Sequence, residues 1–123
     1  MLLVDDNALF REMAEMALTS LGYAVETCSS PEAALARIGG SASFQILITD
    51  VVMAKTNGIE LARQARSIRP EIKVLFCSGY PAAALKRQGL DLHMGEFLLK
   101  PITLGALSAK IDALLTPALE SRS

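Results

Sequence analysis

Short apolar runs alternate along the chain with segments whose apolar residues recur every three or four positions. The runs predict strands covered on both faces, at residues 2–4, 23–28, 44–49, 72–77 and 96–99. The periodic segments predict helices at residues 7–21, 31–38, between 58 and 70, between 81 and 88, and at 104–115. This alternation predicts an α/β fold with a doubly wound, five-stranded parallel sheet of order 2-1-3-4-5 and five helices.

Two features mark the ends and the buried faces of the helices. Ser30 followed by Pro31 is typical of a helix start, and Gly22 is suited to ending the first helix. Met13 and Met16 lie within the first helical segment, and we expect both to belong to its buried face.

The length and charge of the chain narrow the class of protein. With 123 residues it suits one domain, which we place at residues 1–116, followed by a tail or the start of a linker at 117–123. Hydrophobic residues make up 51% and aromatic residues 5%, so the core is aliphatic. The 12 basic and 13 acidic residues are interspersed, which argues against direct binding to nucleic acid or to a membrane.

The cysteines and the amino terminus bear on the cellular compartment. Cys28 and Cys77 each end an apolar run, so we expect buried free thiols; a disulfide or a metal site is the alternative. Two aspartates interrupt the amino terminus before an apolar stretch of signal-peptide length, and no long apolar run follows. We therefore expect a cytoplasmic protein.

Polar residues stand where the predicted strands end. Asp5 and Asp6 follow the first strand, Asp50 the third, Ser78 the fourth and Lys100 the fifth. Ligands of an open parallel sheet bind at the carboxyl ends of its strands, so we expect these side chains to meet at one edge. Taken singly, the first two acids could cap a helix and the other residues could belong to ordinary turns. These separate explanations together are a poor account of the whole pattern.

The chemistry of these residues suits a metal ion and a phosphoryl group. Three neighbouring carboxylates repel one another, and a hard cation with oxygen ligands, Mg²⁺, relieves that repulsion. Lys100 supplies a positive charge, Ser78 supplies a hydroxyl donor, and Gly79 leaves room for close backbone approach.

Four motifs occur in one order along nearly the whole chain, each at the end of a different predicted strand. They are Leu3-Val4-Asp5-Asp6, Thr49-Asp50-Val51-Val52-Met53 with Gly58 further on, Ser78-Gly79, and Lys100-Pro101. In this combination the sequence resembles a response-regulator receiver domain of two-component signalling. The resemblance implies a flavodoxin-like receiver fold.

The same resemblance implies roles for the acids. Asp50 is the phosphoacceptor, and a phosphohistidine on a sensor histidine kinase or a histidine phosphotransfer protein supplies the group. Asp6 ligates Mg²⁺ directly, Asp5 acts mainly through water, and the backbone carbonyl of Val52 completes the protein ligands.

It further implies that Ser78 and Lys100 bind phosphoryl oxygens and that the Lys100-Pro101 bond is cis. Phe97 matches an aromatic switch position that moves together with Ser78, although a purely structural role in the core is the simpler interpretation. Ala54 stands where the family often has proline, which predicts a more mobile loop.

Such a domain catalyses only its own phosphorylation and dephosphorylation. Its output passes to a downstream protein that the sequence does not identify, through the last two helices and the fifth strand, or through phosphorylation-dependent dimerisation. Two alternatives remain: an interaction module that is never phosphorylated, and an aspartyl-phosphate phosphatase of the haloacid-dehalogenase type. The phosphatase needs a second acid where this chain has Val52. A nucleotide-binding protein is disfavoured because no glycine-rich loop follows the first strand.

Overall fold

The computed structural model describes residues 1–40, 44–53 and 56–115. One parallel sheet has the strand order β2-β1-β3-β4-β5. Its strands are β1 (Leu2–Val4), β2 (Glu26–Cys28), β3 (Ile46–Asp50), β4 (Lys73–Ser78) and β5 (Glu96–Leu99). The helices in the described residues are α1 (Ala8–Ser20), α2 (Pro31–Ile38), α3 (Gly58–Ile68), α4 (Ala82–Arg87) and α5 (Leu104–Leu115). The predicted fold class and strand order are confirmed.

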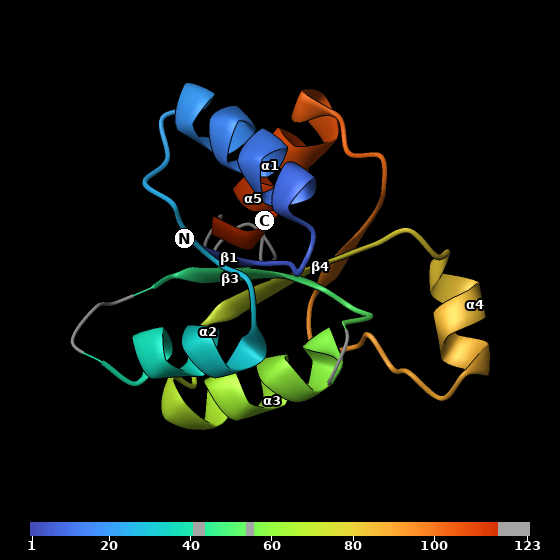
Figure 1. The fold of residues 1–123 in the computed structure, drawn as a ribbon. Helices are drawn as coiled ribbons and strands as arrows, with labels where there is room; N and C mark the ends of the chain where they lie inside the picture. Colours follow the sequence, from blue (N-terminus) through green and yellow to red (C-terminus); the bar gives the residue numbers. More distant parts are fainter. Residues whose placement is uncertain (41–43, 54–55, 116–123) are drawn as a thin grey trace, which may run out of the picture.

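The sheet separates two layers of helices. Figure 1 shows α1 and α5 together on one face of the sheet and α2 and α3 together on the other, with α4 to one side. Side chains alternate along β3, so Leu47 packs in the cluster with α2 and α3 while Ile46 and Ile48 pack in the cluster with α5. Both faces of the strand are therefore covered, which explains its uninterrupted apolar sequence.

The helix ends follow the local sequence. Asn7 caps α1, because its side-chain oxygen accepts a hydrogen bond from the backbone N–H of Phe10 at 2.9 Å. Ser30 caps α2 in the same way, and Pro31 occupies the first turn. Gly22, with φ of 92°, forms the turn after α1 that the sequence predicted. Because Asn7 is the cap of α1, neither Asp5 nor Asp6 is its capping residue.

Strand boundaries differ from the predicted ones most at β2. This strand was predicted from Tyr23 but begins at Glu26. The N–H of Tyr23 still donates to the carbonyl of Leu18, closing the turn after α1, and pairing with β1 starts where the N–H of Glu26 donates to the carbonyl of Met1. The predictions for Ala54 and for the tail at 117–123 fall outside the described residues.

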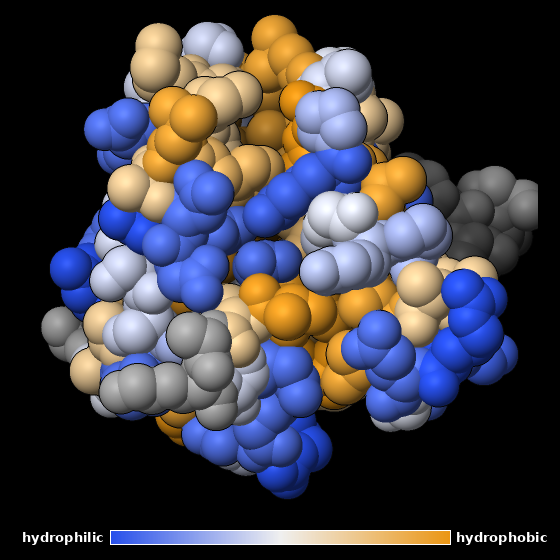
Figure 2. Space-filling model, turned by 45° about the vertical axis from the view of Figure 1, so that its right-hand side comes forward, coloured by the Kyte–Doolittle hydropathy of each residue, from blue (hydrophilic) through white to orange (hydrophobic). Residues whose placement is uncertain are grey.

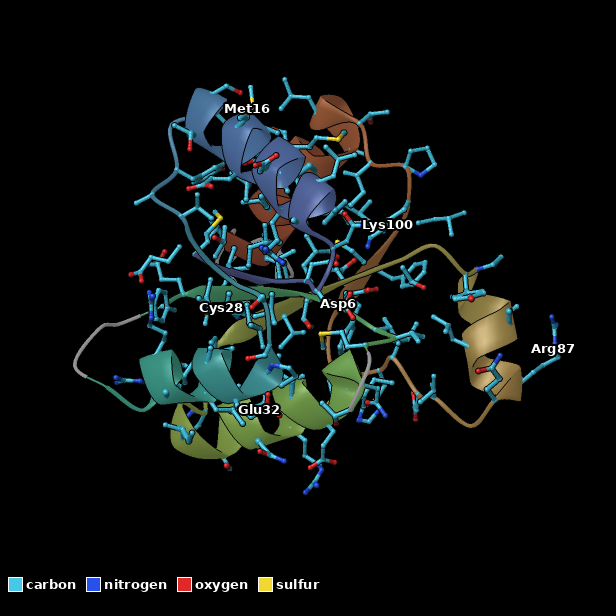
Figure 3. All side chains as sticks on the ribbon, viewed as in Figure 1. Asp6, Met16, Cys28, Glu32, Arg87 and Lys100 are labelled. Atoms are coloured by element: carbon cyan, nitrogen blue, oxygen red, sulfur yellow. The ribbon has the colours of Figure 1, made fainter. Side chains whose placement is uncertain are left out.

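The prediction that Met13 and Met16 belong to the core is wrong. Their exposed fractions are 58% and 73%, and Figure 3 shows Met16 on the outer side of α1. The buried side of α1 is made instead by Leu18, with Phe10 and small alanines packed around it. Because these residues already occupy the side of α1 that faces the sheet, Met13 and Met16 extend from its flank.

Two further predictions concern the cysteines and membrane spans. Cys28 and Cys77 are buried free thiols, as predicted. Burial raises the pKa of the Cys77 thiol to about 12, so this side chain behaves as a small apolar core residue. None of the helices within the described ranges has the length and apolar character that a membrane span requires.

Candidate functional site

The predicted acids meet at the carboxyl end of the sheet. Asp5 and Asp6 follow β1, and Asp50 is the last residue of the neighbouring strand β3. One carboxylate oxygen from each of the three lies within 4.8 Å of the others. The parallel pairing of Val4 with Thr49 explains this, since the next residue of each strand must then emerge at the same edge.

Lys100 completes the cluster from the end of β5, which lies two strands away from β3. Its Nζ lies 2.7 Å from Oδ2 of Asp5 and 3.8 Å from Oδ2 of Asp50. Its backbone N–H donates to the carbonyl of Ser78 at 2.7 Å, and the bond to Pro101 is cis, as the resemblance implied. Figure 3 shows Lys100 and Asp6 at the same end of the sheet.

Asp5 is wholly buried, and each of its oxygens has a partner. Oδ1 accepts the N–H of Asn7 at 2.9 Å, and Oδ2 accepts the ammonium of Lys100. Its backbone carbonyl accepts the guanidinium of Arg11 at 2.7 Å. A buried carboxylate persists only with such partners, so Asp5 is the fixed member of the cluster. Asp6, by contrast, is exposed.

Asp50 has an unusual protonation equilibrium. Burial, together with the nearby charges of Asp5 and Asp6, raises the pKa of its carboxyl to about 6, against the opposing influence of Lys100 and the Val51 N–H. The single ammonium of Lys100 thus does not balance the negative charge of the three acids. The donor set, all carboxylate oxygen at short mutual distances, fits a hard cation such as Mg²⁺.

Gly58 occupies a position where no side chain fits. A Cβ built on it would lie 2.1 Å from the carbonyl oxygen of Asp50, and its N–H donates to the carbonyl of Val51 at 2.7 Å. The first turn of α3 therefore packs directly against the backbone of the candidate acceptor. This contact explains why glycine, rather than any larger residue, follows Asp50 at this spacing.

Ser78 and Val52 lie near the cluster in different ways. Ser78 is buried at the end of β4, one residue beyond the partner of Asp50 in the strand pairing, and its Oγ accepts the N–H of Tyr80 at 2.9 Å. Val52 is 44% exposed in the loop after β3, and its backbone forms an isolated bridge with Asn57. An apolar, solvent-facing side chain thus stands two residues after Asp50.

Phe97 belongs to the sheet rather than to the acidic cluster. It pairs with Phe76 across β4 and β5 and is half-buried against an apolar cluster that includes Val51 and Leu85. These contacts agree with the simpler interpretation, in which Phe97 is a packing residue. Any movement of Phe97 during signalling remains a prediction.

Phe10 and Arg11, both in the first turns of α1, contact this site without having been predicted to do so. The Nζ of Lys100 lies 4.0 Å from the centroid of the Phe10 ring, and Arg11 holds the backbone of Asp5. The spacing of apolar residues places Phe10 on the inner side of a helix. That spacing does not indicate that Phe10 contacts a lysine 90 residues later in the chain.

The surface around the site is uneven in polarity. Figure 2 shows polar surface in the middle of this face, between apolar surface over α1 and α5 and apolar surface beside α4. The exposed apolar side chains of α1 and α5 include Leu9, Met13, Met16 and Leu104. A partner approaching the acids would therefore meet both charge and apolar surface.

Comparison with known proteins identifies the family. The sequence pattern of the response regulator receiver domain matches residues 1–112. The chain is 34% identical over 117 residues to the response regulator receiver protein CpdR of Brucella abortus, covering 95% of this chain and 97% of that protein. The chain is a receiver domain of the response-regulator family. It spans about half the length of several other curated relatives that it matches.

Solved receiver structures share the fold. The chemotaxis protein CheY4 of Vibrio cholerae superposes with a TM-score of 0.82 at 28% identity, covering 93% of this chain and 96% of that one. The response regulator TrrA of Thermotoga maritima, solved in complex with Mg²⁺-BeF, superposes with a TM-score of 0.77 at 27% identity, covering 93% and 96%. Receiver domains of this family are phosphoacceptor signalling domains that bind Mg²⁺ in an acidic pocket and pair with histidine kinases or phosphotransfer proteins.

Proposed function

We propose that this receiver domain takes a phosphoryl group onto Asp50 from a phosphohistidine of a sensor histidine kinase or a histidine phosphotransfer protein. The observation that carries the proposal is the position of Lys100. Its ammonium lies 2.7 Å from Asp5 and 3.8 Å from Asp50, beside three carboxylates that gather within 4.8 Å. The positive charge of Lys100 thus lies where it could stabilise a phosphoryl group bound to Asp50.

The acids would hold Mg²⁺ in this proposal. Asp6, Asp50 and the backbone carbonyl of Val52 would be direct ligands, and Asp5, already paired with Lys100, would act mainly through water. When bound, the ion neutralises the acids and screens the phosphoryl oxygens from them. Asp6 suits a direct ligand because it is exposed and free of the contacts that engage Asp5.

The side chains divide the remaining chemistry. A carboxylate oxygen of Asp50 attacks phosphorus, the bond from phosphorus to the histidine nitrogen breaks, and its electron pair returns to the imidazole. With a pKa of about 6, Asp50 is ionised at neutral pH and needs no separate base. Lys100 and the Ser78 hydroxyl would bind the oxygens of the transferred phosphoryl group. The hydroxyl would then give up the hydrogen bond that it accepts from the N–H of Tyr80.

The output of the reaction would be a changed protein surface. We propose that Ser78 and Phe97 relay phosphorylation to the face made by α4, β5 and α5, which then binds a downstream protein or a second copy of the domain. The domain would act on itself alone, because Val52 stands where an aspartyl-phosphate phosphatase needs its second acid. We further propose that the receiver extends to residue 116, that 117–123 form a tail or the start of a linker, and that the protein is cytoplasmic.

The direct test is phosphorylation by a small phosphodonor such as acetyl phosphate or phosphoramidate with Mg²⁺. Intact-mass measurement should show an increase of one phosphoryl group, which disappears in Asp50→Asn and after chelation of the metal. Asp91→Asn is a matched control, because that acid is exposed and lies beside His93, outside the acidic cluster. An unmodified native protein would refute the proposal, as would an undiminished increase in Asp50→Asn.

A further inference from the structure

The ammonium of Lys100 is surrounded on three sides. Asp5 lies 2.7 Å away, Asp50 lies 3.8 Å away, and the face of the Phe10 ring lies 4.0 Å away, measured to its centroid. Only 21% of the lysine side chain is exposed. A cation this close to an aromatic face is attracted by the negative charge above the ring, and more strongly when water is largely excluded.

We propose that Phe10 is a positioning residue for Lys100, holding its ammonium over the carboxylates by a cation–π contact. This inference rests on the proposed function and adds a residue to it. Phe10 would not touch the phosphoryl group. It acts through Lys100, by restricting the directions in which that flexible side chain can point.

The first turn of α1 is built to hold the ring in place. The N–H of Phe10 donates to the capping side chain of Asn7 at 2.9 Å, and the next residue, Arg11, grips the carbonyl of Asp5 at 2.7 Å. One helical turn therefore locates both the carboxylate that binds the lysine and the ring that covers it. A shift of this turn would move both contacts together.

The ring is not held by dense packing alone. Phe10 borders an apolar cavity of about 230 Å³ between α1 and α5, which is also lined by Met13, Ile102 and Leu104. A side chain next to such a space has room to move. Its contact with the ammonium and the backbone position set by the cap are thus the specific interactions that place the ring over Lys100.

An aromatic ring is the chemically appropriate third neighbour. A further carboxylate would add to the repulsion among Asp5, Asp6 and Asp50, whose carboxylate oxygens already lie within 4.8 Å of one another. A hydrogen-bond acceptor would occupy an ammonium N–H that a phosphoryl oxygen needs. The ring attracts the cation without net charge and without a directed hydrogen bond, so those N–H groups stay available.

Fluorination of Phe10 tests the contact at nearly constant shape. Mono-, tri- and pentafluorophenylalanine at this position withdraw charge progressively from the ring face and weaken its attraction for a cation. We expect the rate constant for phosphorylation by acetyl phosphate to fall step by step, by roughly three- to tenfold across the series. A flat series would overturn the inference, since packing alone does not respond to ring charge.

Natural substitutions provide the control. Phe10→Leu should lower the rate constant by a similar factor, whereas Phe10→Tyr, which retains an aromatic face, should restore it. Met13→Leu, which lines the same cavity one turn further along α1, should leave it unchanged. Equal rate constants in Phe10→Leu and the native protein would contradict the proposed role.

A second measurement does not depend on phosphorylation. The NMR resonances of the Lys100 side-chain end should be displaced by the ring current of Phe10 and should move toward ordinary lysine positions in Phe10→Leu, but not in Met13→Leu. If the native protein accepts no phosphoryl group, the proposed function fails while this displacement can persist. If it accepts one and neither the fluorinated series nor the resonances respond, only the role of Phe10 fails.

Discussion

The carboxyl rim of the sheet and the apolar interior directly beneath it differ in what their side chains contribute to stability. In the interior, residues such as Leu47 and Ile48 are almost fully removed from water and pack in apolar clusters. At the carboxyl ends of β1 and β3, Asp5 and Asp50 bring like charges together in a partly dry space. The interior therefore stabilises the fold, whereas the rim stores electrostatic repulsion that a ligand can relieve.

Lys100 lies at the rim but, like the interior residues, contributes to the stability of the fold. Its ammonium compensates Asp5, which has no contact with water, so this one ion pair at the rim is required by the fold. Asp50 and Asp6 are under no such requirement. The contrast shows which charges of the site the fold depends on and which it merely tolerates.

The largest expected effect lies in the interior. Leu47→Ala should lower the free energy of unfolding by about 4 kcal/mol, because it removes a fully buried side chain and leaves a cavity between the sheet and α2 and α3. Urea denaturation followed by circular dichroism measures this change. A loss below about 1 kcal/mol would mean that this layer repacks freely and would remove the contrast with the rim.

Next in size is the loss of the rim ion pair. Lys100→Met should lower the free energy of unfolding of the metal-free protein by about 3 kcal/mol, because the buried carboxylate of Asp5 loses its charged partner. The double variant Asp5→Asn with Lys100→Met should recover part of the loss, since neither charge then remains unpaired. If the single variant is as stable as the native protein, Asp5 does not depend on Lys100.

Removal of the acceptor charge should act in the opposite direction. Asp50→Asn should raise the free energy of unfolding at neutral pH by about 2 kcal/mol, because it removes a carboxylate whose ionised form is disfavoured by burial and by Asp5. Thermal unfolding in a chelating buffer checks this, with an increase in Tm on the order of 5 °C or more. A destabilised variant would show that the acids of the rim do not repel one another.

The size of this effect depends on pH. The folded state binds a proton at Asp50 up to a pKa of about 6, above the ordinary value of 3.8, so the contribution of this group to stability falls as pH rises between these values. The advantage of Asp50→Asn over the native protein should therefore be near zero below about pH 4 and grow until about pH 6. Equal pH dependence in the two proteins would contradict the raised pKa.

The smallest of the four effects is stabilisation by metal. At about ten times its Kd, Mg²⁺ should raise the free energy of unfolding of the native protein by about 1.4 kcal/mol. Asp6→Asn tests the site cleanly, because Asp6 is exposed and its loss leaves the buried pair intact. The variant should lose most of the increase, and a full increase would place the ion elsewhere.

The fold was largely predictable because its signals are local. Apolar runs, helical periodicity and the cap at Ser30 each depend on neighbouring residues, and the strand order follows from few physical alternatives. The errors also have local causes. Tyr23 continues the turn after α1 although it looks like part of a strand, and Met13 and Met16 are apolar residues on an exposed flank.

The sequence by itself determined which residues reach the carboxyl end of the sheet, because that depends only on where each strand stops. Only the tertiary structure decided which of these residues contact one another at that end. It pairs Lys100 with Asp5 more closely than with Asp50, places the Phe10 ring over the ammonium, and excludes a side chain at position 58. These contacts join segments as far as 95 residues apart, and their distances depend on how strands and helices pack, which no local pattern encodes.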